Sequence, residues 1–348
     1  SGTDTMARSL TQLQVLLVAG LLWQPCGAIA DPIADFYRQK TVTFLTVYAP
    51  GGSYDLYGRL IATHLPRFIP GNPKVVVQYL PGAGGLNGAM RLANQSPKDG
   101  TEIGMPDRGI AVNQVLSASS VPLDASKFNW IGSVSNYDGI VQVAAQTGVK
   151  NADDLRRIPV VMGSWGVETS SYTLPVLLNA LAGMKFKVVT GYRGAAEVDL
   201  AIEGGEVEGR ISSWVTLKYL KPALLADGKV VVVLQSGVKR NPDLPQVPLI
   251  DEVATSEQGR RILAFIDSDT AIGWSVIAPP GVPPERVAAL RQAFDEMVKD
   301  PKFLADANAR HLDVRPSSGP ELEALINRTL SIPKEDVAAM NKLLATKK

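Results

Sequence analysis

The sequence is short of cysteine and histidine, and it has no excess of charge of either sign. Its 348 residues include one cysteine, two histidines, 35 lysines and arginines, and 34 aspartates and glutamates. One thiol excludes an intrachain disulfide, and two imidazoles leave little for a zinc site. A formal net charge of +1 gives no basic surface of the kind that binds nucleic acid. We therefore expect no metal, no cofactor and no nucleic-acid partner.

What the chain does contain is enough apolar material for a folded core. Hydrophobic residues make up 45% and charged residues 20% of the sequence, and charges of both signs are interspersed, which argues against disorder. A chain of this length is expected to form about two domains.

The first thirty residues have the pattern of a secretory signal. Arg8 precedes an apolar block over residues 15–23, and Ala28-Ile29-Ala30 follows it, which is the order expected of an export signal. The block is shorter than the roughly 20 apolar residues of a membrane span. The alternative is a buried N-terminal helix. A lipid anchor on Cys26 is disfavoured, because the residues just before it are not small.

Cleavage after Ala30 would leave a mature chain without cysteine. Such a chain needs no oxidative folding, and its stability must come from its core, which fits a bacterial periplasmic protein. We therefore predict export to the periplasm.

Beyond the signal, short β-rich segments alternate with amphipathic helical segments. Leu56, Leu60, Ile61 and Leu65, for example, recur at helical spacing after a β-rich segment over residues 41–48. Further strands are predicted over residues 75–80, 102–105, 140–145, 159–162, 186–190, 208–212, 230–234 and 274–278. Further helices are predicted over residues 171–182, 195–203 and 321–330, with others starting near Leu86, Pro284 and Pro333. This repetition predicts two α/β domains, with parallel sheets covered by helices.

The first of three glycine-rich loops covers residues 48–55, between a strand and a helix. Its glycines allow a ligand to approach the backbone closely, and the following helix presents unpaired amide groups and a positive dipole end. Such a loop suits a carboxylate or a phosphate. Its candidate ligand-binding residues are Tyr48, Gly52, Ser53 and Tyr54. The alternative is that Ser53 or Asp55 only caps the helix.

The second loop covers residues 81–88 and contributes Ala83 and Gly84 as candidates. It resembles a dinucleotide-binding fingerprint but departs from it, because Asn87 stands where the third glycine should fall. Backbone contact with an anion and a purely structural turn remain open, and so does nucleotide binding by an α/β enzyme.

The third loop covers residues 163–172 and offers several hydroxyl groups at the start of a helix. Ser164, Trp165 and Thr169 are its candidates, while Thr169 or Ser171 is also expected to cap the helix. The loop is no nucleophile elbow, since Met162 stands where the first glycine of that motif would be. We therefore do not expect a hydrolase.

Five motifs in this order resemble the solute-receptor family of tripartite tricarboxylate transporters, also called Bug receptors. They are the segments at residues 49–55, 81–85, 98–101, 191–194 and 278–283. The resemblance implies a periplasmic binding protein of type II-like fold, in which two lobes, each a sheet flanked by helices, are joined by crossover strands. It also implies an organic anion in the cleft between the lobes, and delivery of that anion to the permease subunits of a membrane transporter. We expect lobe 1 to comprise residues 31–136 and 273–348, and lobe 2 to comprise residues 137–272.

The sequence departs from the family pattern near the expected cleft of lobe 2. Ser171-Tyr172 stands where the family often has serine and histidine, and Thr190-Gly191-Tyr192 stands where it often has Val-Pro-Tyr. Arg210–Trp214 replaces an aspartate-rich strand end. The ligand therefore need not be a tricarboxylate, and di- and aromatic carboxylates are equally open. Tyr54, Trp165 and Trp214 are candidates for an aromatic wall, although Trp214 also fits the core.

Simple magnitudes indicate how such a cleft would bind its ligand. Micromolar affinity is about −8 kcal/mol, and a hydrogen bond to a charged group contributes roughly 1.5–3 kcal/mol, so roughly three to five neutral donors suffice. No buried arginine is required. Asp107 and Arg108 complete the candidates, although two adjacent opposite charges are also typical of a surface pair.

The sequence therefore predicts a non-enzymatic, extracytoplasmic receptor for a small carboxylate. Two alternatives are a nucleotide-dependent α/β enzyme that uses residues 81–88, and a ligand sensor for a membrane signalling partner.

Overall fold

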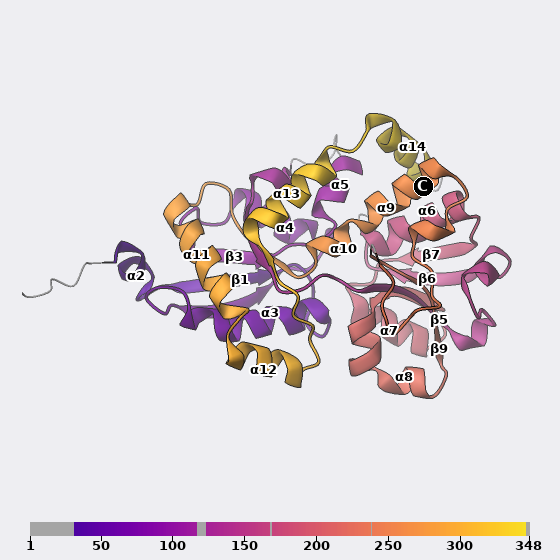
Figure 1. Cartoon of the computed structure of the whole chain (residues 1–348), viewed down its shortest axis with the longest axis horizontal. Coiled ribbons are helices and arrows are strands. Elements are labelled where there is room, and N and C mark those ends of the chain that lie inside the picture. Colours follow the sequence, from indigo (N-terminus) through magenta and orange to yellow (C-terminus); the bar gives the residue numbers. More distant parts are fainter. Residues whose placement is uncertain (1–30, 117–122, 168, 238, 346–348) are drawn as a thin grey trace, which may run out of the picture.

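The computed structural model describes residues 31–116, 123–167, 169–237 and 239–345. The predicted signal and its cleavage point lie outside these residues. The described chain forms two mixed sheets, each flanked by helices (Figure 1). This arrangement confirms the prediction of a two-lobed α/β fold.

The first sheet has the strand order β11-β4-β10-β3-β1-β2. Its strands are β1 (Thr41–Thr46), β2 (Lys74–Tyr79), β3 (Glu102–Met105), β4 (Asn129–Ser133), β10 (Ser275–Ala278) and β11 (Ser317–Ser318). Helices α2 (Pro32–Tyr37), α3 (Ser53–His64), α4 (Leu86–Asn94), α5 (Ile110–Leu116), α11 (Pro284–Met297), α12 (Pro301–Ala309) and α13 (Gly319–Leu330) accompany it. Alternate side chains of β1 enter two different cores, because strand neighbours point to opposite faces. Phe44 packs with the core that contains Leu60 and Phe294, and Leu45 packs with the core that contains Leu92 and Trp130.

The second sheet has the strand order β7-β6-β8-β5-β9. Its strands are β5 (Gly139–Ala144), β6 (Val160–Ser164), β7 (Phe186–Thr190), β8 (Gly209–Ser213) and β9 (Val230–Gln235). Helices α6 (Ser170–Ala182), α7 (Ala195–Glu203), α8 (Pro222–Ala226) and α9 (Glu257–Asp267) surround it. Leu177, Met162 and Ile262 belong to its main core, while Val198 of α7 packs in a smaller core with Val207.

The prediction that both sheets are parallel is wrong for strands next to the connections between them. β1 pairs in parallel with β2 and β3, but β10 runs antiparallel to β3 and β4. In the second sheet β5 runs antiparallel to β8 and β9. Ser133 at the end of β4 pairs with Ser275 at the start of β10, so the chain leaves and re-enters the first sheet at the same end of these two neighbouring strands. Such a return gives an antiparallel pair, whereas a helical crossover would give a parallel one.

Two extended connections link the sheets and pair with each other. Trp274 donates its backbone N–H to Ser135 O at 3.0 Å, and Tyr137 donates to Thr270 O at 2.8 Å. Gly273 adopts a φ of 56° there, and a Cβ at this position would lie 2.0 Å from Ser135 O. Only glycine fits this close approach. The second connection also contains the short helix α10 (Asp269–Ile272).

The C-terminal helix α14 (Lys334–Ala345) packs on α6 and α9, beside the second sheet (Figure 1). Its Met340 is fully buried in the main core of that sheet. This helix falls in the range predicted for lobe 1, but it contacts mainly the helices of the second sheet, and α5 beside them. The lobe boundaries themselves stay a prediction.

Candidate functional site

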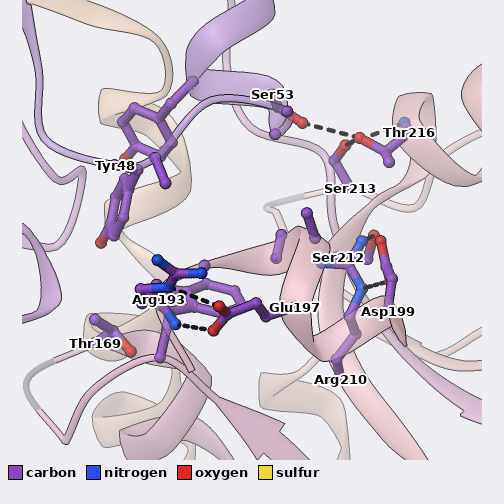
Figure 2. Close-up of a pocket in the computed structure, with 18 of the residues that line it drawn as sticks. Tyr48, Ser53, Thr169, Arg193, Glu197, Asp199, Arg210, Ser212, Ser213 and Thr216 are labelled. Carbon is purple, nitrogen blue, oxygen red and sulfur yellow. Dashed lines mark hydrogen bonds and ion pairs between the residues drawn. The ribbon is translucent and has the colours of Figure 1, made fainter. Parts of the chain in front are cut away.

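A cavity of about 460 Å³ lies where loops from both sheets meet. Its volume lies within the usual range for small-molecule sites, about 300–1,000 Å³. The loops after β1, β3, β6 and β7, together with the end of β8 and the residues that follow it, line the cavity. A cleft outside the carboxyl ends of strands is the common ligand site in α/β sheets. Figure 2 shows the residues around this cavity, which we call the inner compartment.

The start of α3 borders the inner compartment with unused backbone donors. Gly52 is its N-cap residue, and no side chain caps the helix there. The Ser53 hydroxyl instead reaches Thr216 Oγ1 at 2.9 Å, on the opposite wall. Asp55 turns away and accepts hydrogen bonds from Gly51 N–H at 3.0 Å and from Tyr79. Ser53 therefore does not cap the helix, and Asp55 holds the loop.

Aromatic side chains cover one wall of the inner compartment. Tyr48 and Tyr54 lie 4.7 Å apart between ring centroids, and Trp165 meets Tyr48 edge-on at 6.5 Å. Trp274 and Tyr137, from the connections, continue the wall at 5.4 Å from each other. This wall offers apolar surface to a small organic molecule.

Asp107 and Arg108 are both buried, so the expectation of a surface pair is wrong. Asp107 Oδ2 accepts a hydrogen bond from the Tyr48 hydroxyl at 2.7 Å, and burial raises the pKa of its carboxyl. Arg108 Nε lies 3.3 Å from Asp269 Oδ2, while its Nη2 donates to Ser170 Oγ at 3.0 Å. Its guanidinium also lies 3.6 Å from the centroid of the Tyr137 ring. Arg108 thus joins both walls at the end of the cavity near the connections.

The opposite wall carries charges that the sequence analysis did not assign to the site. Arg210 on β8 lies 2.7 Å from Asp199 on α7, and Lys221 contacts the other oxygen of Asp199 at 2.7 Å. Arg210 Nη2 also donates to Ser212 Oγ at 3.0 Å. Nearer the first loops, Arg193 donates to Glu197. The only sequence signals were Arg210 at an unusual strand end and Arg193 within a family motif.

The lining residues of the inner compartment include four cations and three carboxylates. The cations are Arg108, Arg193, Arg210 and Lys221, and the carboxylates are Asp107, Glu197 and Asp199. Each carboxylate already has partners among the described residues. Buried arginines thus line the cavity beside the neutral donors, and the prediction that neutral donors suffice for binding stays a prediction. Arg108 is in turn paired with Asp269, so the charges around the cavity balance. Cationic groups that keep free N–H donors can still bind an anion there.

The structure brings most, but not all, of the predicted site residues together. Tyr48, Gly52, Ser53, Tyr54, Asp107, Arg108, Trp165 and Thr169 line the inner compartment. Ala83 and Gly84 line an adjoining cavity of about 450 Å³, which we call the outer compartment.

The structure does not bring Ser164 or Trp214 to the inner compartment. Ser164 is buried beneath the loop and shares a hydrogen bond with Ser171 at 2.8 Å. The Trp214 indole donates to Asp243 at 2.9 Å. Thr169 is the N-cap residue of α6, but its hydroxyl donates to Gly166 O at 2.8 Å and caps no amide.

In the described part of the chain, no group of three or more His, Cys, Asp or Glu side chains is placed to hold a metal ion. Within the same residues, no helix has the length and apolarity needed to cross a bilayer.

Comparison with known proteins gives consistent matches. Residues 67–341 match the sequence profile of the tripartite tricarboxylate transporter family receptor. Protein BugT of Bordetella pertussis is 23% identical over 316 residues, which cover 83% of this chain and 86% of BugT.

Two solved structures share the fold. The periplasmic binding protein BugD is 19% identical with a TM-score of 0.66, and the match covers 87% of this chain and 97% of BugD. Rpa4515 of R. palustris, solved with adipate, is 20% identical with a TM-score of 0.68, over 87% of this chain and 97% of Rpa4515. The chain therefore has the two-lobed fold of periplasmic binding proteins.

Proposed function

Because the chain belongs to the tripartite tricarboxylate transporter receptor family, we propose that it captures a small organic carboxylate in the cleft between its lobes. The observation that carries this proposal is the inner compartment, where donors from both sheets surround a space of suitable size. The adipate in Rpa4515 supports an organic acid as the class of ligand.

In this proposal the ligand is held by donors from facing walls. The backbone amides at the start of α3 and the Ser53 and Thr169 hydroxyls come from loops that border the cavity. Lys221 and Arg210 supply charge from the opposite wall. Hydrogen bonds to a charged group contribute roughly 1.5–3 kcal/mol each, so a few of them account for micromolar affinity. The aromatic wall covers the carbon skeleton of the acid.

The proposal includes export and delivery. The chain would be exported by residues 1–30, cleaved after Ala30, and act in the periplasm. It would then pass its ligand to the permease subunits of a tripartite transporter. Permease genes beside the gene for this chain are expected, and a membrane kinase gene in their place would instead favour a ligand sensor.

Isothermal titration calorimetry against malate, adipate, citrate and benzoate tests the proposed ligand class. We expect micromolar binding of at least one acid and none of glucose or putrescine. Lys221→Gln should weaken that binding by roughly tenfold, because it removes one charged donor.

Lys229→Gln is the matched control, since Lys229 also contacts an aspartate but lies outside the inner compartment. It should leave affinity unchanged. Binding of NAD or ATP with no binding of any acid would contradict the receptor and favour an α/β enzyme that uses residues 81–88.

A further inference from the structure

The inner and outer compartments adjoin each other and have three lining residues in common. The outer compartment is bordered by residues 81–84 after β2, residues 165–167 after β6, and residues 190–193 at the end of β7. Tyr48, Trp165 and Arg193 line both compartments. The space open to a ligand therefore depends on the positions of these three side chains.

Arg193 is held in place from one side only. Glu197, in the first turn of α7, accepts hydrogen bonds from the Arg193 backbone N–H at 2.7 Å and from its Nε at 2.6 Å. Among the described residues, no hydrogen bond or ion pair engages its terminal Nη1 and Nη2 groups. Figure 2 shows the guanidinium in the open space between Tyr48 and Glu197. Arg193 thus presents a positioned, unpaired fork of donors to the cleft.

Two of the loops that border the outer compartment touch each other. A Cβ on Gly166 would lie 3.2 Å from the Cα of Gly84, so these two backbones touch. A ligand that extends past Arg193 would therefore lie in the outer compartment, against the loops that carry Gly84 and Gly166. The length of ligand that fits therefore depends on the position of the Arg193 side chain. In its present position it borders the inner compartment, and if it moves away a longer ligand can reach the outer compartment.

We propose that Arg193 is a specificity-determining residue that divides the cleft and limits the length of the bound acid. This inference rests on the proposed function. A short α,ω-dicarboxylate places one carboxylate against the wall of Arg210 and Lys221 and the other on the Arg193 fork, a geometry that guanidinium and carboxylate favour. A longer diacid must displace Arg193 from Glu197 to reach the outer compartment. Glu197 is the positioning residue for Arg193.

Calorimetry with succinate, adipate, suberate and sebacate tests this division, with hexanoate as an acid that lacks the second carboxylate. Arg193→Ala should weaken the best short diacid by roughly tenfold, since a charged contact is lost. The same variant should bind suberate or sebacate at least as well as the unmodified chain does, because the compartments are joined. Hexanoate binding should stay the same. Glu197→Gln should shift the ratio of short to long diacids in the same direction, by a smaller factor.

Arg157→Ala is the matched control. Arg157 is 77% exposed and pairs with Asp154, much as Arg193 is 78% exposed and pairs with Glu197, but it lies outside both compartments. It should leave all affinities unchanged.

The outcomes separate the inference from the function on which it rests. If the unmodified chain binds diacids but Arg193→Ala leaves the ratio of the affinities for short and long diacids unchanged, the inference about Arg193 is overturned. The proposed receptor function is then unaffected. If Arg193→Ala weakens hexanoate as much as the diacids, Arg193 is a general anion contact and the inference also fails. If the unmodified chain binds no acid of any length, the receptor function itself is overturned.

Discussion

At the scale of single residues, burial decides how the carboxylates near the connections behave. Burial raises the pKa of Asp267 to about 7 and the pKa of Asp269 to about 6. Asp267 accepts a hydrogen bond from Gly237 N–H at 2.7 Å, and Asp269 lies beside Arg108. These partners favour the ionised forms, but they do not offset the loss of water.

This burial predicts that the free energy of unfolding falls as the pH rises from about 4 to about 7. In the unfolded chain both carboxyls titrate near a pKa of about 3.9. Between that value and their folded pKa values, the folded chain binds more protons than the unfolded chain, so acidification stabilises it. Carboxyls with a lowered pKa, such as Asp306, act in the opposite direction, but at lower pH. Urea unfolding at about pH 5 and about pH 8 should differ by at least about 1 kcal/mol, since one pKa unit corresponds to about 1.4 kcal/mol.

Asp267→Asn should remove much of this difference, because the amide keeps an oxygen for Gly237 and carries no charge. Asp153→Asn, at an exposed position, is the control and should leave the slope unchanged. Equal slopes in the unmodified chain and Asp267→Asn would contradict the prediction.

At the scale of elements, periodicity predicted most helices and strands to within a few residues. It missed β4, whose segment Asn129–Ser133 is short and contains polar residues and glycine. It also missed the shorter helices α2, α5, α8, α10 and α12. It missed α9 too, although Ser256 caps that helix and Ile262, Leu263 and Ile266 recur at helical spacing. Local pattern also could not place α14, because an amphipathic helix fits any complementary apolar face.

Met340→Ala should therefore destabilise the chain by about 2–5 kcal/mol, the usual cost of truncating a buried methionine. Met340 is 0% exposed and fills the core between α14 and the helices of the second sheet. Chemical denaturation followed by circular dichroism measures this loss.

Leu304→Ala on α12 is a suitable control, because its side chain is 40% exposed. Leu304→Ala should lower the free energy of unfolding far less than Met340→Ala does. Equal losses of unfolding free energy in the two variants would show that the packing of α14 does not depend on Met340.

At the scale of the whole molecule, the walls of the cleft touch at several points. Ser53 meets Thr216, Arg108 meets Ser170, and the Tyr219 ring stacks on His311 at 4.9 Å. Arg315 also contacts Asp138 on the first connection. Such contacts are those expected when a hinged binding protein is closed.

Ser53→Ala and Thr216→Val should each weaken ligand binding by roughly two- to tenfold, because each removes one hydrogen bond of closure. Ser53→Ala also removes a proposed ligand donor, so it should cost more than Thr216→Val. Because both variants remove the same bond between the walls, their combination should weaken binding little more than Ser53→Ala alone. Titration of the four proteins with the best acid from the screen completes the double-mutant cycle. Strictly additive effects would show that this contact does not couple the two walls.

The sequence alone determined the properties that depend on local pattern: the alternation of strands and helices, the glycine-rich loops and the family resemblance. The export signal stays a prediction from the same kind of pattern. Glycine spacing identified the loop at Gly52, which lines the inner compartment, because a glycine-rich turn is a local feature. Trp214 was misplaced because β8 ends at Ser213, and the chain then turns the indole toward Asp243.

Only the tertiary structure decided which charges share the cleft. Asp199, Arg210 and Lys221 lie on separate elements, and their contact depends on how β8 and its neighbouring helices pack. The burial of Arg108 likewise follows from the connections folding back beside it. Periodicity reports which face of an element is apolar, but the partners of a polar side chain are set by contacts between segments that are distant in sequence.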